Sequence, residues 1–173
     1  MQGLTPGQIT AWLDSHGQIE DPYLGDFEPP FRVQCYAPST YFATEYFLRG
    51  VLSLIIMEGD LVIQATDWSP TEECRDFVFR TMQREANELR PMVEAPGFLI
   101  PRLEEERAIA VFAFTVCFKW KSYLYGAMDQ TTLYNWEGDI FDFWTSSEIK
   151  RDQFLNLMLQ FKLDEIRDEP NIK

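Results

Sequence analysis

The sequence predicts a single compact α/β domain, a small mixed sheet of about four strands packed by about five helices. A chain of 173 residues with 46% hydrophobic residues is long and apolar enough to bury a core. Segments with helical apolar spacing alternate along it with segments in which every second residue is apolar. No repeat, low-complexity tract or linker divides the chain. We therefore expect residues 1–173 to form one domain with three layers.

The N-terminal segment, residues 1–17, predicts a short helix. Thr5-Pro6-Gly7-Gln8 has the residues of a capping box, with proline at the first helical position. An apolar stripe follows, and His16 and Gly17 mark the helix end. Residues 18–30 contain four acids and three prolines, and this composition indicates an irregular acidic loop.

The next segments predict strand, helix and strand. Residues 31–36 alternate between apolar and polar side chains, which favours a strand. Residues 41–57 carry apolar side chains at helical spacing. The competing interpretation is a hairpin in which Val51–Met57 would be a strand. Residues 60–66 read as a strand under both interpretations.

Two further helices are predicted in the middle of the chain. Ser69-Pro70-Thr71-Glu72 has the residues of a second capping box, and the helix after it is expected to reach Asn87. Its inward side chains are expected to be Cys74, Phe77, Val78, Met82 and Ala86. The uncharged run from Ala108 to Phe118 is shorter than the roughly 20 residues of a membrane span. Its apolar spacing predicts a buried helix over 102–119, with the acids 104–106 in the first turn.

The C-terminal third predicts two strands and a helix. The strands are expected at 122–128 and 139–145. Thr145-Ser146-Ser147-Glu148 indicates a helix start, and the apolar spacing carries the helix to about Arg167. The tail, residues 168–173, is expected to fray.

The charge of the chain bears on its partners. The formal net charge is −13, and no basic run occurs anywhere. Binding to nucleic acid or to an anionic membrane surface needs clustered lysine and arginine, so both classes are disfavoured. A basic protein partner is favoured, because opposite fields steer association.

The residues that usually carry catalysis are sparse. Cys35, Cys74 and Cys117 are far apart, which argues against disulfides and zinc and indicates free thiols in a reducing, cytoplasmic compartment. The N-terminus lacks the basic and apolar regions of a signal peptide. The only histidine is His16, and phosphate-binding glycine motifs are absent. We expect no cofactor, no bound metal and no catalytic set.

Two carboxylates offer an alternative site. Asp67 follows the strand at 60–66, and Asp129 follows the strand at 122–128. If these strand ends meet at one edge of the sheet, the two carboxylates would be placed to bind Mg²⁺ or a ligand. This arrangement would make the protein a small metal-dependent enzyme or a ligand-binding protein.

The segment from Tyr134 to Trp144 is the main candidate for a binding surface. It combines five aromatic residues with three acids. An aspartate between two apolar residues on one strand face is unusual in a strand covered on both sides, so an edge strand is expected. Aromatic anchors with charged neighbours are typical of protein interfaces. The candidate partner-binding residues are Tyr134, Trp136, Asp139, Asp142 and Trp144, with the first two in the loop before the strand.

These observations together predict a non-catalytic acidic protein-binding domain. The most concrete form is an inhibitor or immunity-type protein that neutralises a basic protein such as a toxin or nuclease. A structural subunit of a homo-oligomer, such as a homodimer whose exposed aromatic residues meet their copies, is a third possibility.

Overall fold

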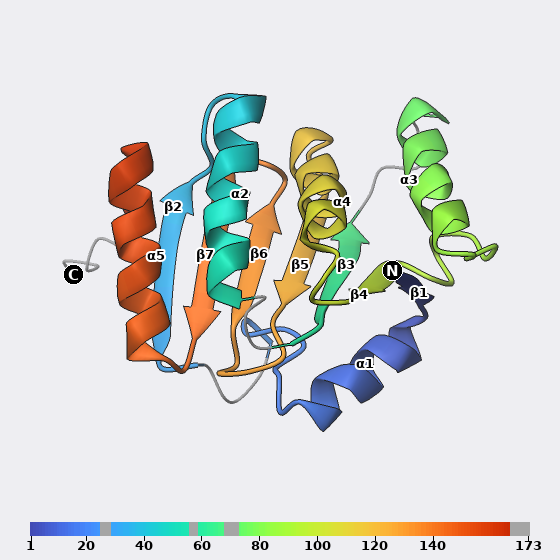
Figure 1. The fold of residues 1–173 in the computed structure, drawn as a ribbon, viewed down its shortest axis with the longest axis horizontal. Helices are drawn as coiled ribbons and strands as arrows, with labels where there is room; N and C mark the ends of the chain where they lie inside the picture. Colours follow the sequence, from blue (N-terminus) through green and yellow to red (C-terminus); the bar gives the residue numbers. More distant parts are fainter. Residues whose placement is uncertain (25–28, 56–58, 68–72, 167–173) are drawn as a thin grey trace, which may run out of the picture.

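The computed structural model describes residues 1–24, 29–55, 59–67 and 73–166, without the side chains of residues 73–76. Figure 1 shows the elements in these ranges. They are, in chain order, β1 (Gln2–Leu4), α1 (Pro6–Ser15), β2 (Phe31–Tyr36), α2 (Tyr41–Ile55), β3 (Leu61–Asp67), α3 (Glu73–Glu85), β4 (Gly97–Ile100), α4 (Glu105–Cys117), β5 (Lys121–Tyr125), β6 (Thr132–Trp136), β7 (Ile140–Thr145) and α5 (Glu148–Phe161). The predicted α/β class and five helices are confirmed.

The sheet is larger than predicted and has a different arrangement. Its seven described strands have the order β1-β4-β3-β5-β6-β7-β2. Every pairing between them is antiparallel, so the predicted mixed sheet of about four strands is wrong. The three missed strands are β1, β4 and β6. The first two have only 3 and 4 residues, too few to show a period.

One face of the sheet packs against three helices, which lie side by side in Figure 1 with α2 between α5 and α4. This interface is rich in phenylalanine: Phe47 of α2 stacks on Phe141 of β7, and Phe154 of α5 stacks on Phe143. The helix predicted over 41–57 is confirmed through Ile55, and the competing hairpin is wrong for Val51–Ile55. Residues 56–58 lie outside the described ranges.

The apolar run after residue 104 is the buried helix that its spacing predicts. In α4 most side chains from Ala108 to Val116 are buried, and Glu105 and Glu106 occupy the first turn. No helix in the described part of the chain is long and apolar enough to cross a membrane.

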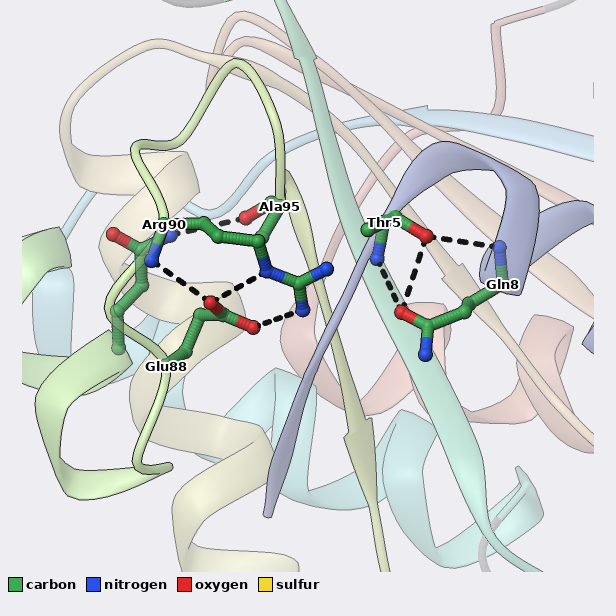
Figure 2. A network of polar contacts seen from close by, with 6 residues as sticks. Thr5, Gln8, Glu88, Arg90 and Ala95 are labelled. Atoms are coloured by element: carbon green, nitrogen blue, oxygen red, sulfur yellow. Dashed lines mark hydrogen bonds and ion pairs between the residues drawn. The ribbon is translucent and has the colours of Figure 1, made fainter.

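Helix α1 packs on the other face of the sheet. The capping box predicted at Thr5 and Gln8 is confirmed, and Figure 2 shows its reciprocal hydrogen bonds. Ile9 and Leu13 of α1 join an apolar cluster with Val62 of β3. Gly97 makes this close approach feasible, because a Cβ there would lie 2.8 Å from Ile9 Cδ1.

The predicted buried face of α3 is partly wrong. Phe77, expected to be buried, is 68% exposed, whereas Phe79 is buried and packs near Phe98 of β4. The capping residues 69–72 and the side chain of Cys74 lie outside the described part. In the first half of the loop between α3 and β4, Figure 2 shows Glu88 and Arg90 facing each other. The Arg90 guanidinium holds the pKa of Glu88 at about 2 through its hydrogen bonds to the carboxylate.

The last helix starts as predicted and ends early. The Ser147 hydroxyl caps α5 by accepting a hydrogen bond from the backbone N–H of Lys150. The helix ends at Phe161, because Lys162 takes a left-handed conformation with φ 55°. The chain then returns to the sheet, where the N–H of Ile166 donates to the carbonyl of Gln34 in β2.

Candidate functional site

The sheet face that carries α1 also carries a continuous group of aromatic side chains. Directly opposed residues of neighbouring strands share a face, so the register places Gln64, Tyr123, Tyr134 and Asp142 in one row across β3, β5, β6 and β7. We call this side of the sheet the aromatic face. Its aromatic members on the strands are Tyr36, Tyr123, Tyr125, Tyr134, Trp136 and Trp144.

The rings that β5 and β6 contribute to the aromatic face are in contact with one another. Tyr123 stacks on Tyr134 with 4.3 Å between ring centroids, and on Tyr125 with 5.4 Å. Trp136 meets Tyr134 edge to face at 4.9 Å. Such contacts hold the rings in fixed positions, because each ring restricts the rotation of the next.

Tyr23, from the loop after α1, covers the centre of this group. Its ring lies 5.5 Å from the rings of both Trp136 and Trp144. The Arg32 guanidinium of β2 lies over two rings, 5.3 Å from the centroid of Tyr23 and 5.0 Å from that of Trp144. The loop is therefore part of the aromatic face and not a detached linker.

A cavity of about 440 Å³ lies where this loop meets β3 and β5. The residues that line it are Ile19, Glu20, Asp21, Leu24, Gln64, Thr66, Tyr123 and Tyr125. The Tyr125 hydroxyl donates a 2.6 Å hydrogen bond to the backbone carbonyl of Glu20, and it lies 3.3 Å from Gln64 Oε1. We call this site the tyrosine–acid pocket.

Negative charge is in excess around the pocket. Neither Glu20 nor Asp21 forms an ion pair with any lysine or arginine in the described part. Lys121, at the start of β5, already pairs with Asp67 at 3.0 Å and with Glu137 at 3.2 Å. The hydrogen bonds that Lys121 donates to these two carboxylates raise its pKa, with Asp67 contributing more than Glu137. A positive ligand would therefore meet two carboxylates that are not already neutralised.

The tyrosines of the pocket are neutral at physiological pH. Burial raises the pKa of the Tyr123 hydroxyl, and the Asp21 carboxylate raises it further. Burial likewise places the pKa of Tyr125 well above its usual range. The rings therefore offer uncharged π faces and hydroxyl groups, while the carboxylates supply the charge.

Two of the predicted partner-binding residues are buried. The Asp142 side chain is 0% exposed, and Trp144 is 1% exposed. The prediction that their strand lies at an edge is wrong, because β7 pairs with β6 on one side and β2 on the other. A cation from the neighbouring strand makes burial of the aspartate possible: Arg32 donates from Nε to Oδ1 and from Nη2 to Oδ2, both at 3.0 Å.

The other three predicted residues differ in exposure. Tyr134 is buried beneath Tyr23, whereas Trp136 is 36% exposed and donates from its indole N–H to the Tyr23 hydroxyl. Asp139 lies in the turn after β6, is largely exposed and pairs with Lys119. Tyr134 and Trp136 belong to strand β6, so their predicted place in a loop is wrong.

The two carboxylates of the alternative site lie at opposite ends of the sheet. Asp67 pairs with Lys121 at the start of β5, whereas Asp129 follows the end of β5. The expected meeting at one edge is wrong, because β3 and β5 are antiparallel. Asp129 instead pairs with the buried Lys150 at 3.2 Å. No group of three or more potential metal-ligating His, Cys, Asp or Glu side chains occurs in the described ranges.

The environments of Cys35, Cys117 and His16 give these side chains structural roles and do not activate them for catalysis. Burial raises the pKa of the Cys35 thiol to about 12, and burial also raises the pKa of Cys117. Neither thiol is poised as a thiolate nucleophile. His16 caps α1, where its Nδ1 lies 2.7 Å from the carbonyl oxygen of Trp12 and its ring stacks on that tryptophan.

The sequence interpretation missed the pocket. From the sequence, Glu20 and Asp21 belong to a predicted irregular loop. Tyr123 belongs to a predicted strand, and the sequence assigns it no binding role. The available signal was a pair of adjacent acids in a loop, next to proline and tyrosine, since loops on a rigid scaffold often carry binding residues. Only the fold brings this loop to Tyr123 and Tyr125.

Comparison of the chain with protein-family models, with curated proteins and with solved structures gives no match.

Proposed function

We propose that this chain is a non-catalytic acidic binding domain that neutralises a more basic protein, as an inhibitor or immunity-type protein neutralises a toxin or nuclease. The tyrosine–acid pocket carries the proposal. It combines neutral aromatic walls with Glu20 and Asp21, which have no cationic partner among the described residues. Aromatic faces next to carboxylates are suited to a cation, so a basic partner is the class that fits.

The surface around the pocket provides contact area for a protein. Leu24 is 85% exposed at the pocket rim, and Tyr23 and Trp136, which contact each other, are partly exposed on the aromatic face. Partly exposed aromatic residues around a concave site are typical anchors of interfaces. In this proposal Asp142 and Trp144 support the surface from below, while Tyr23, Leu24 and Trp136 make the contact.

The net charge supports the same class of partner. A charge of −13 attracts a basic protein over distances of about 10 Å at moderate salt, and this attraction falls as salt rises. The association rate should therefore depend strongly on ionic strength.

The proposal is tested by comparing three immobilised proteins in capture from a lysate of the source cells. They are the wild type, the variant Glu20→Gln/Asp21→Asn, and the control Glu85→Gln/Glu94→Gln, which changes the net charge by the same amount. We expect the wild type and the control to capture the same basic protein at low salt. The pocket variant should lose it. Equal capture by all three would contradict the proposal, as would capture of nothing.

A separate observation favours self-association as a second candidate. Three exposed aromatic side chains lie in the first two turns of α2: Tyr41, Phe42 and Tyr46. An exposed aromatic cluster of this kind is typical of an interaction surface. Light scattering of the wild type and of Phe42→Ser/Tyr46→Ser separates the candidates. A salt-insensitive dimer that the substitutions convert to a monomer would assign this cluster to a homodimer.

A further inference from the structure

We propose that the tyrosine–acid pocket takes a guanidinium group, supplied by an arginine side chain of the basic partner. This inference rests on the proposed function for the source of the arginine. The chemical preference of the pocket for a guanidinium is a separate property of the protein and is tested directly.

The aromatic face already binds one guanidinium within the chain. Arg32 lies over the rings of Tyr23 and Trp144, and it forms a two-pronged interaction with the carboxylate of Asp142. Stacking on aromatic rings together with a forked contact to a carboxylate is the combination that suits a planar guanidinium. The same face of the sheet thus already contains a guanidinium bound by aromatic rings and a carboxylate, which is the mode of binding that we propose for the pocket.

The neighbouring pocket repeats this combination of groups. Tyr123 and Tyr125 supply aromatic surface, and Glu20 and Asp21 supply carboxylates. Gln64 and Thr66 add a side-chain carbonyl and a hydroxyl at the sheet side of the pocket. A guanidinium has five N–H donors in a plane, so it can stack on a ring and still donate to several acceptors. An ammonium group is a compact, strongly hydrated point charge and uses the aromatic walls less well.

The size of the pocket limits its occupant. A cavity of about 440 Å³ is at the small end of the range for ligand sites, which is roughly 300–1,000 Å³. It accommodates one long side chain but not a folded segment. The partner is therefore expected to insert a single arginine, and the rim around Leu24 meets the rest of its surface.

The loop that supplies the carboxylates is fixed before binding. The Tyr125 hydroxyl holds the backbone of Glu20, and the backbone N–H of Tyr23 donates to Asp21 Oδ1 at 2.9 Å. Groups that are ordered in the free protein do not have to be ordered on binding, so less affinity is lost to that ordering.

The test is an NMR titration of the free protein with each of three small probes. The probes are the N-acetyl, N′-methylamide derivatives of arginine, lysine and citrulline, the last being the uncharged analogue of arginine. We expect the arginine probe to shift the signals of residues 19–24 and 123–125, with a dissociation constant on the order of 1 mM. The lysine probe should bind at least about fivefold more weakly, since it lacks the stacking plane, and citrulline should not bind.

Variants connect the binding to the pocket. Glu20→Gln/Asp21→Asn should raise the dissociation constant of the arginine probe at least about tenfold. Glu85→Gln/Glu94→Gln should leave its affinity unchanged. Both variants change exposed or half-buried positions, so both are expected to fold. Equal affinity for arginine and lysine, or for arginine and citrulline, would overturn the guanidinium assignment. So would unchanged affinity in the pocket variant, or no binding of the arginine probe.

The probe titration and the lysate capture distinguish failure of the guanidinium inference from failure of the proposed function. If the arginine probe does not bind but the wild type still captures a basic protein through Glu20 and Asp21, the guanidinium inference is wrong and the proposed function stands. If the probe binds the pocket but no protein is captured, the guanidinium preference stands and the proposed protein partner is wrong.

Discussion

The hydroxyl of Tyr125 in β5 donates a 2.6 Å hydrogen bond to the backbone carbonyl of Glu20, a residue 105 positions earlier in the chain. This bond ties the loop after α1 to the middle of the sheet. It fixes the carboxylates of Glu20 and Asp21 beside the aromatic rings of β5. The position of the tyrosine–acid pocket therefore depends on a contact between two distant parts of the sequence.

Removing the Tyr125 hydroxyl should loosen the pocket. In Tyr125→Phe the ring remains and the Glu20 carbonyl loses its donor, which lowers the free energy of unfolding by about 1 kcal/mol. The affinity for the arginine probe should fall several-fold, because the carboxylates are less well positioned. Urea unfolding and the NMR titration measure the two effects. Tyr46→Phe, at an exposed position, is the control, and equal behaviour of the two variants would contradict the role of this hydrogen bond.

Replacing Asp142 should cost stability, whereas replacing Asp139 should not. Asp142 is fully buried and accepts hydrogen bonds from Arg32 and Gln34. Asp142→Asn weakens these charge-assisted bonds and should lower the free energy of unfolding by about 2 kcal/mol. Asp139→Asn removes the same charge from an exposed turn and should change stability by less than about 0.5 kcal/mol. Urea unfolding of the two variants measures both effects. Similar losses of unfolding free energy for both would contradict a stabilising role of the buried Asp142–Arg32 pair.

The ion pair of Glu88 and Arg90 should give stability that disappears in acid. The pKa of Glu88 is about 2 in the folded protein, below the ordinary value of 4.5. A carboxylate with a lowered folded pKa stabilises the protein above its unfolded pKa, and this contribution is lost as the pH falls towards the folded pKa. The stability difference between the wild type and Glu88→Gln should therefore shrink from pH 5 to pH 2. A difference that stays constant across this range would contradict the lowered pKa.

The turn between β6 and β7 should not tolerate a side chain at Gly138. Glu137 and Gly138 have φ values of 51° and 78°, and a Cβ on Gly138 would lie 2.3 Å from the carbonyl oxygen of Val116. Gly138→Ala should lower the free energy of unfolding by about 2 kcal/mol. The control is Gly7→Ala in α1, where a Cβ meets nothing within 4 Å and stability should stay equal or rise. Thermal unfolding of both variants checks the pair, and a neutral Gly138→Ala would mean that the turn differs from this geometry.

The long periodic elements could be predicted from the sequence, and the short ones could not. The spacing of apolar residues in α2 and α4 determines the buried side of each helix, and the capping box of α1 gives its first residue. The strands β1 and β4 are too short to show a periodicity of their own. They form because β4 pairs with the edge of β3 and β1 then pairs with β4. Strand β6 had a usable signal, since Glu137-Gly138 between two aromatic runs is typical of a hairpin turn.

The candidate site depended on tertiary contacts that residue types alone do not indicate. Asp142 between two apolar residues indicated an exposed edge, but Arg32 on the next strand made burial possible. Asp67 and Asp129 were expected to meet because both follow strands, but antiparallel pairing separates them. The aromatic and acidic character of the binding surface was recognised in the segment 134–144, whereas the pocket itself lies one strand away.

The most direct measurement is site-specific photo-crosslinking in the source cells from two positions. One photoreactive residue replaces Leu24 at the rim of the pocket, and the other replaces Phe42 in the exposed aromatic cluster of α2. We expect a crosslink from position 24 to a protein that is basic overall, and we expect its loss when Glu20→Gln/Asp21→Asn is added. A crosslink only from position 42 to a second copy of the chain, with none from position 24, would contradict the proposed binding of a basic protein at the pocket.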